Sequence, residues 1–206
     1  PWLLGLPDPH RPDWNALSQP PSFTSGHWFG TDAIGRDILA RTLAGGRLSL
    51  TIGALATVVA LVVGLAWGAI AGYAGGRTER LMVRALDVLS ALPFLLIVIL
   101  LLALFGRSLW LLLAAIGGYV WIDLARVARA EAARLREMPF VLAARAAGAR
   151  FDQVLRWHLL PNLLPLGLVY LGLILPQAIL VESFLGFLGL GVDEPAASWG
   201  GLLGEG

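Results

Sequence analysis

Few side chains in this sequence could carry out enzymatic chemistry. The 206 residues include no lysine and no cysteine. This excludes a P-loop, whose lysine contacts phosphate, and also thiolate metal sites, disulfides and cysteine nucleophiles. The three histidines, His10, His27 and His158, are far apart in the sequence, so we expect them at surfaces or interfaces rather than in a metal site. We therefore expect no catalytic residue, metal site or bound cofactor in this chain.

Carboxylates beside apolar runs are a second group of side chains that could have a functional role. Glu182 follows a long apolar run, and acidic residues in or near a membrane often belong to transport pathways. Two roles stay open for Glu182: a possible pore mouth, or a structural partner for an arginine. Asp87 and Asp123 lie at the ends of other apolar runs and are expected to be structural. Asp193–Glu194 is expected to lie in a plain loop.

Cationic side chains are concentrated in one stretch of the sequence. Seven arginines fall between residues 126 and 156: Arg126, Arg129, Arg134, Arg136, Arg145, Arg150 and Arg156. An arginine at the centre of a bilayer costs roughly 2.5 kcal/mol or more, so this stretch is not expected to cross lipid. The net charge of the chain is only +1, which gives no electrostatic reason to expect nucleic acid as a partner.

The rest of the sequence is unusually apolar. It is 57% hydrophobic and 14% charged, against about 25% charged in ordinary globular proteins. Uncharged runs occupy residues 48–76, 88–106, 108–122 and 157–181. A helix needs about 20 apolar residues to cross a bilayer core, and the short third run is extended by apolar residues beyond Asp123. Four such runs would leave a soluble protein almost no polar surface, so we predict an all-α membrane helix bundle with four spans.

Glycines recur at every fourth position of the first run. Gly64, Gly68, Gly72 and Gly76 would all lie on one face of a helix, where the absence of side chains lets a neighbouring backbone approach closely. The alternative is simple abundance, since the chain has 25 glycines. The regular spacing favours a helix-packing face.

The arginine distribution predicts an orientation. The linker between the first two runs and the linker between the last two are rich in arginine, whereas no basic residue follows Glu182. The positive-inside rule places these two linkers in the cytoplasm. We therefore expect residues 1–47 to form an extracytoplasmic segment. Residues 48–206 would form the transmembrane domain, with a cytoplasmic region at 126–158.

This cytoplasmic region has the pattern of two short helices. Pro139 suits a first helical position, and Gly148 can end the helix in a left-handed conformation. A second helix is expected from about Phe151 into the fourth run. An apolar stripe at helical spacing is predicted from Phe140, Ala144, Ala147, Phe151 and Val154. The alternative is an interfacial helix that lies on lipid headgroups, but the small extent of the apolar face argues against deep insertion into lipid.

The same region resembles the cytoplasmic signature of ABC-importer permeases. That signature is Glu-Ala-Ala, three residues, Gly, nine residues, then Ile-x-Leu-Pro, and Ala143-Ala144, Gly148 and Pro161 fit its spacing. Leu142 and His158 stand where the family usually has Glu and Ile. Leu142 cannot make the polar contact that a glutamate would make at this position.

Two further stretches, 29–50 and 181–203, resemble the C-type subunit of the dipeptide, oligopeptide and nickel permease subfamily. The resemblance implies a pore-forming subunit, not itself an enzyme, with the family's first and last spans missing from this chain. It implies that the helix from Pro139 to Arg150 is a coupling helix that docks into an ATP-hydrolysing subunit. The coupling residues would be Pro139, Phe140, Ala143, Ala144, Ala147, Gly148 and Pro161.

The resemblance also implies the partners. These are a second homologous permease, two cytoplasmic ATP-binding subunits, an extracytoplasmic solute-binding protein and the lipid bilayer of a bacterial or archaeal cytoplasmic membrane. The alternatives are an ATP-independent carrier or channel, which would give the cytoplasmic helices no role, and a membrane-embedded enzyme, which would need convergent His, Asp or Ser side chains. Peptides, nickel and related small solutes all remain open as cargo.

Overall fold

The computed structural model describes residues 6–192 and 196–205. In chain order its helices are α1 (Ile38–Ala74), α2 (Gly76–Ala91), α3 (Phe94–Phe105), α4 (Leu109–Arg136), α5 (Pro139–Ala146), α6 (Phe151–Val154), the π-helical segment η2 (Leu155–Leu159), α7 (Leu160–Phe187) and α8 (Trp199–Glu205). The described residues contain no strand, and one isolated bridge joins Thr31 and Asp37. The predicted all-α helix bundle is confirmed.

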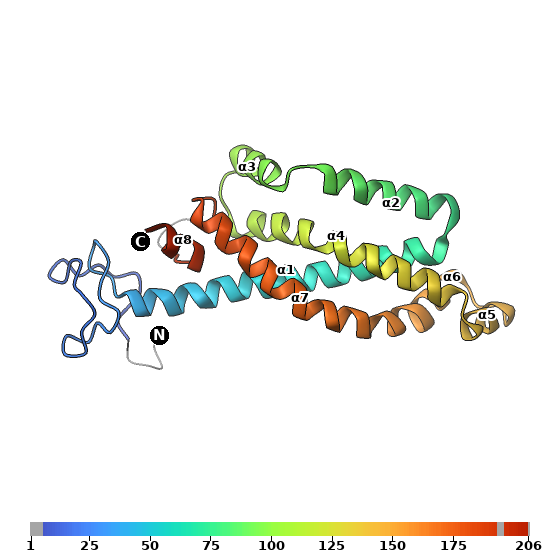
Figure 1. Ribbon diagram of the computed structural model, residues 1–206, viewed down its shortest axis with the longest axis horizontal. Helices are drawn as coiled ribbons and strands as arrows, with labels where there is room; N and C mark the ends of the chain where they lie inside the picture. The colour runs from blue at the N-terminus through green and yellow to red at the C-terminus, as the bar shows by residue number, and fades with distance from the viewer. Residues whose placement is uncertain (1–5, 193–195, 206) are drawn as a thin grey trace.

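The core of the bundle is formed by α1, α4 and α7. α1 and α4 run in the same direction, and α2 and α7 return in the opposite one (Figure 1). Three continuous helical stretches, Ile38–Ala74, Leu109–Arg136 and Phe151–Phe187, are long and apolar enough to cross a membrane. Below, the two ends of the bundle are named after the short helices that lie there, the α8 end and the α5 end.

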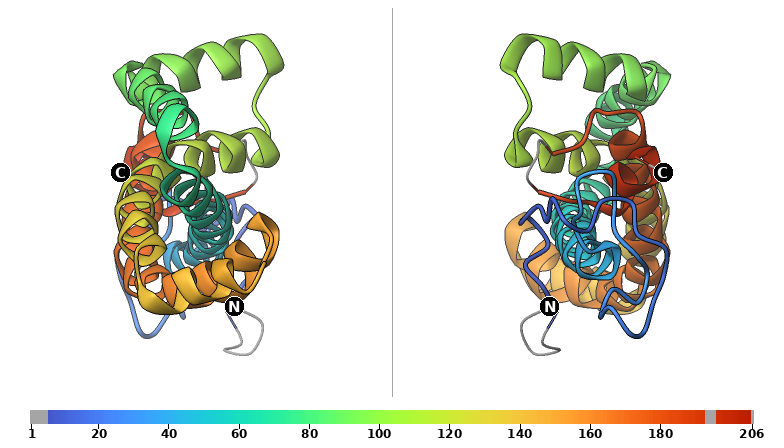
Figure 2. Two further views of the ribbon diagram at one scale, coloured as in Figure 1. Left: turned by 90° about the vertical axis from the view of Figure 1, so that its right-hand side faces the viewer. Right: turned by 90° about the vertical axis from the view of Figure 1, so that its left-hand side faces the viewer.

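The second predicted span differs from a simple helix. The run 88–106 covers the end of α2 and all of α3, which meet at a bend of 78°. Pro93 lies at this bend, where its missing N–H and fixed φ interrupt the helix. The pair counts as a fourth span only if the bent helices are taken together. Both helices lie to one side of the bundle in the end-on views, and Leu86 of α2 is buried against it (Figure 2).

The first helix begins ten residues before its predicted run. Asp37 caps α1, because its side chain accepts a hydrogen bond of 2.7 Å from the Ala40 N–H. α1 ends before Gly75, and Gly76, with φ of +58°, already belongs to α2. The prediction that Gly76 shares the glycine face of the first helix is therefore wrong, since the chain reverses direction before it.

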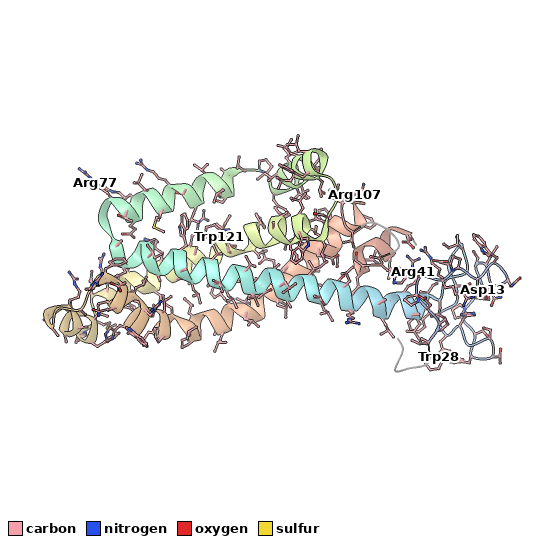
Figure 3. The ribbon with its side chains drawn as sticks, turned by 180° about the vertical axis from the view of Figure 1, so that it is seen from behind. Asp13, Trp28, Arg41, Arg77, Arg107 and Trp121 are labelled. Atoms are coloured by element: carbon pink, nitrogen blue, oxygen red, sulfur yellow. The ribbon has the colours of Figure 1, made fainter. Side chains whose placement is uncertain are left out.

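At the α8 end, a charged cluster joins three parts of the chain (Figure 3). The buried Arg41 guanidinium pairs with the carboxylates of Asp32, at 2.5 Å, and Glu205, at 2.7 Å. Burial raises the pKa of Asp32, but hydrogen bonds from Arg36, Ile34 and Arg41 together outweigh it and hold that pKa below its usual 3.8. The cluster fixes the N-terminal segment and α8 to the start of α1.

Candidate functional site

The candidate site is the turn-helix-turn at the α5 end of the bundle. Pro139 occupies the first turn of α5, after Met138 in extended conformation. After the helix, Gly148 N–H donates to Arg145 O and Ala149 N–H donates to Ala144 O, each at 3.0 Å. Gly148 has φ of +87°. These two bonds form a Schellman motif, so the predicted helix start and left-handed Gly148 are confirmed.

One face of α5 is fixed to the bundle and the other is free. Val141 is fully buried, whereas Leu142 and Phe140 are 49% and 41% exposed. We call the side of α5 that faces away from Val141 the α5 outer face; it consists of Pro139, Phe140, Leu142, Ala143, Ala146 and Ala147. None of these side chains carries a charge. The exposed Arg145 is one turn after Val141 and lies outside this face. The α5 outer face is therefore a small apolar surface at the tip of the protein.

The predicted apolar stripe does not form one buried face. Val154 is buried and Ala144 is partly buried, but Phe140, Ala147 and Phe151 are exposed. The reason is that a helical period holds only within one helix, and the turn at Gly148 starts a new helix with a different orientation. The Phe151 ring instead lies beside Tyr73 of α1, with centroids 4.7 Å apart.

A continuous helical stretch joins this site to the last span. α6, η2 and α7 follow one another without a break from Phe151 to Phe187, as the sequence predicts. The π-helical segment, which the sequence did not predict, ends two residues before Pro161. Proline cannot donate a backbone hydrogen bond, and a π turn accommodates that loss. Asn162 Nδ2 donates to the His158 carbonyl at 2.6 Å.

Glycines hold α1 close to α4, the helix that leads into α5. A β-carbon added to Gly68 would lie 2.5 Å from Ala128 Cβ, and one added to Gly72 would collide with the Arg129 carbonyl. A β-carbon on Gly64 would lie 3.1 Å from the Leu124 side chain. All three glycines lie where α4 packs closely on α1. Close backbone contact makes α1 and α4 a rigid pair.

Comparison with known proteins identifies the family. Residues 64–206 match the family described as the binding-protein-dependent transport system inner membrane component. The chain belongs to this family. The α5 end, with its Schellman turn and continuous link to α7, is thus a feature of an inner-membrane transport component.

Individual relatives narrow the match. The chain is 47% identical over 194 residues to the oligopeptide transport system permease protein OppC of Haemophilus influenzae, covering 94% of this chain and 62% of that protein. It is 44% identical over 194 residues to OppC of Escherichia coli, covering 94% of this chain and 64% of that protein. It is 42% identical over 187 residues to the dipeptide transport system permease protein DppC of Bacillus subtilis, covering 91% of this chain and 58% of that protein. The predicted resemblance is confirmed, and the chain spans about three fifths of the length of these relatives.

Glu182 is buried within the bundle near the end of α7. Its side chain is fully buried, and its Oε1 has no hydrogen-bond partner among the described residues. Its Oε2 lies 3.5 Å from Ser183 Oγ. No arginine partner is found for it in the part of the chain that the structure describes. The sequence could not show this burial, because Glu182 lies near the end of an apolar run whose depth depends on packing.

The remaining predicted polar residues have simple environments. Asp87 accepts a hydrogen bond of 3.2 Å from Arg126, consistent with its predicted structural role, and Asp123 is exposed. His27 Nδ1 lies 2.9 Å from Asp37 Oδ2. No group of three His, Asp or Glu side chains within residues 6–192 and 196–205 is arranged to hold a metal ion. Asp193–Glu194 falls outside the described residues.

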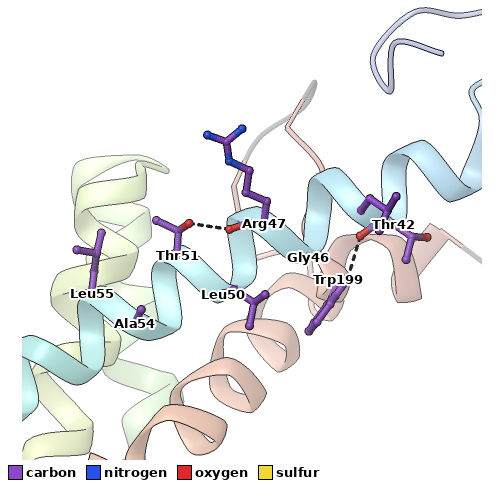
Figure 4. Close-up of a pocket in the computed structure, with 9 residues that line it drawn as sticks. Thr42, Gly46, Arg47, Leu50, Thr51, Ala54, Leu55 and Trp199 are labelled. Atoms are coloured by element: carbon purple, nitrogen blue, oxygen red, sulfur yellow. Dashed lines mark hydrogen bonds between the residues drawn. The ribbon is translucent and has the colours of Figure 1, made fainter. Parts of the chain in front are cut away.

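An apolar hollow of about 670 Å³ lies on the outside of α1 near the α8 end (Figure 4). It extends from Thr42 to Leu55 and is bounded by Trp199, whose indole N–H donates to the Thr42 carbonyl at 3.0 Å. This hollow is at the opposite end of the bundle from α5 (Figure 1). It therefore takes no part in the candidate site.

Proposed function

We propose that the chain is a pore-forming permease subunit of an ATP-driven importer for peptides or related small solutes. The observation that carries the proposal is the α5 outer face, an uncharged surface exposed at the tip of a short helix. Val141 fixes the inner side of this helix to the bundle. A partner that moves α5 would therefore move the ends of α4 and α7 as well, and a rigid connection of this kind suits alternating access.

The proposed partner of α5 is an ATP-hydrolysing subunit in the cytoplasm. Alanine at positions 143, 146 and 147 lets a groove approach the helix backbone closely, while Phe140 and Leu142 offer larger side chains for burial. Leu142 is an apolar group where the resemblance leads one to expect a glutamate. We expect this contact to be mainly hydrophobic.

The arginines near α5 support the proposed orientation. Arg126, Arg129, Arg134 and Arg136 occupy the last turns of α4, and Arg145, Arg150 and Arg156 follow close by. The positive-inside rule assigns such an end to the cytoplasm. The α8 end, with the N-terminal segment, would face outward, where a solute-binding protein delivers its ligand.

The proposed pore needs a second permease subunit. α2 and α3 have only a few buried residues, and the outward side chains of α3 are apolar. The cargo class comes from the relatives, which are oligopeptide and dipeptide permeases. An ATP-independent carrier is the second candidate, but it gives the α5 outer face no function.

Reconstitution tests the proposal. The full-length chain would be placed in proteoliposomes with its second permease and ATPase subunits, and supplied with the solute-binding protein. Uptake of a labelled peptide that requires both ATP and the binding protein is the expected result. Equal uptake without ATP would support the carrier and contradict the proposal.

A further inference from the structure

A row of three arginines on α2 has no role in the proposed coupling. Successive helical residues turn by about 100°, so Arg77, Arg80 and Arg84 lie within an arc of about 60°. Leu86, which is almost completely buried, lies on the opposite side of the helix. The three arginines are exposed, and Arg77 extends away from the bundle (Figure 3). They therefore form a single outward cationic face.

These arginines have no acidic partner in the part of the chain that the structure describes. The two carboxylates of α2 are engaged elsewhere, since Glu79 pairs with Arg129 at 2.5 Å and Asp87 pairs with Arg126 at 3.2 Å. With Leu81, the three guanidinium groups line a shallow hollow of about 280 Å³. An anion could approach this hollow without displacing an internal ion pair.

The outward face changes from charged to apolar along the helix. Leu81 and Val88 lie on the same side as the arginines and are 67% and 64% exposed. From Arg77 to Arg84 the axis advances about 10 Å, and beyond Arg84 this side of the helix carries the aliphatic Val88, while the exposed Asp87 is paired with Arg126. The headgroup layer of a bilayer is about 5–8 Å thick on each side. This gradient matches a helix that passes from the headgroup layer into hydrocarbon.

We propose that the Arg77–Arg80–Arg84 face of α2 binds the phosphate groups of anionic phospholipids in the cytoplasmic leaflet. Guanidinium groups bind phosphate through paired hydrogen bonds, and Leu81 and Val88 would contact the adjoining acyl chains. The proposal rests on the cytoplasmic placement of this end given under the proposed function. It adds a specific lipid requirement that the transport reaction does not imply.

Lipid binding to the assembled complex tests the proposal. The complex containing the full-length chain would be titrated in neutral detergent with phosphatidylglycerol or phosphatidylcholine, and bound lipid counted by native mass spectrometry. One arginine at an anionic surface contributes about fivefold in affinity, so R80Q/R84Q should weaken phosphatidylglycerol binding by about 25-fold. Phosphatidylcholine binding should not change. R80K/R84K should retain most of the preference, because the charge is kept.

The matched control is R11Q/R47Q, which removes two exposed arginines near the α8 end and should leave the lipid preference unchanged. Full phosphatidylglycerol preference in R80Q/R84Q would overturn the proposal. So would loss of a partner subunit from that variant with lipid binding unaffected, since the face would then be a protein interface. Displacement of the lipid by excess inorganic phosphate would indicate a free-anion site instead. None of these readouts depends on transport, so failure of the proposed import function would be distinguishable.

Discussion

Arg41 and Glu205 are 164 positions apart, yet the Arg41 guanidinium donates hydrogen bonds of 2.7 and 2.9 Å to the two oxygens of the Glu205 carboxylate. Arg41 is only 2% exposed. A bidentate pair fixes orientation as well as distance, so it holds α8 in one position against the first turn of α1. The Trp199 contact with the Thr42 carbonyl reinforces the same junction.

Replacing Arg41 by Gln should destabilise the protein by roughly 2–3 kcal/mol. The substitution removes the buried one of the two cations that pair with the Asp32 and Glu205 carboxylates. Arg36 stays beside both, and Glu205 is partly exposed, so the penalty is smaller than for a fully buried pair that loses its only cation. Thermal unfolding of the purified full-length chain in detergent measures the effect. R47Q, on the exposed side of the same helix, is the control. Equal melting temperatures for R41Q and R47Q would contradict the structural role of the cluster.

Replacing Glu182 by Met should stabilise the bundle. The buried Oε1 has no hydrogen-bond partner among the described residues, and an unsatisfied buried polar group costs roughly 1–3 kcal/mol. Met has a similar volume and no polar oxygen. The same thermal assay measures the gain, with Gln177→Met on an exposed position of α7 as the control. A lower melting temperature for E182M would show that the carboxyl group makes a contact required by the fold.

Replacing Gly68 by Ala should lower stability by roughly 1–3 kcal/mol, and Gly68→Leu should also reduce the yield of assembled complex. The added β-carbon would meet Ala128 Cβ at 2.5 Å and the Ala125 carbonyl at 2.7 Å, so α1 and α4 must separate. Gly118→Ala is the control, because its β-carbon would meet nothing within 4 Å. If the two alanine variants melt at the same temperature, the glycine face is not a close-packing surface.

The sequence predicts this fold best where a local rule decides the outcome. The start of α5 at Pro139 and its end at Gly148 follow from backbone chemistry within a few residues. The glycine face of α1 follows from a spacing that repeats inside one helix. Neither feature requires knowledge of how distant segments pack.

Long-range features were not predictable in the same way. The pairing of Arg41 with Glu205 joins the first helix to the last one, and no local pattern indicates it. The burial of Glu182 depends on packing around α7. For the bend between α2 and α3, Pro93 itself is a local indication. The apolar run continues on both sides of Pro93, so hydrophobic composition does not reveal that the helix is broken there.

The orientation of the bundle can be tested by labelling single cysteines in the cysteine-free chain. A cysteine replacing the exposed Arg145 should react with a membrane-impermeant thiol reagent only from the cytoplasmic side. A cysteine replacing the exposed Ala196 should react only from outside. The expectation comes from the concentration of arginines at the α5 end. Labelling of both positions from one side of intact cells would contradict it.

A further prediction concerns the turn that ends α5. Gly148 adopts φ of +87°, but a β-carbon there would meet no atom within 4 Å. Substitution therefore acts through backbone strain and not through collision. Gly148→Val should disturb the turn and reduce ATP-driven uptake by the reconstituted complex. Gly148→Asn should retain most of it, because Asn tolerates left-handed backbone conformations. Gly148→Asp shares that backbone tolerance but adds a charge beside the proposed interface. It should therefore reduce ATP-driven uptake more than Gly148→Asn does.

The α5 outer face can be tested without disturbing the turn. Ala143 is exposed opposite the buried Val141, so Ala143→Trp should leave the spans folded while blocking close approach of the ATPase subunit. Ala144→Trp, at a partly buried position, should also uncouple but with some loss of stability. Binding-protein-stimulated ATP hydrolysis and peptide uptake should fall together, or the ATPase subunits should dissociate. Ala54→Trp, at an exposed position beside the hollow on α1, is the control. Normal uptake by the Ala143→Trp complex, present at normal levels, would show that energy from ATP does not enter through α5.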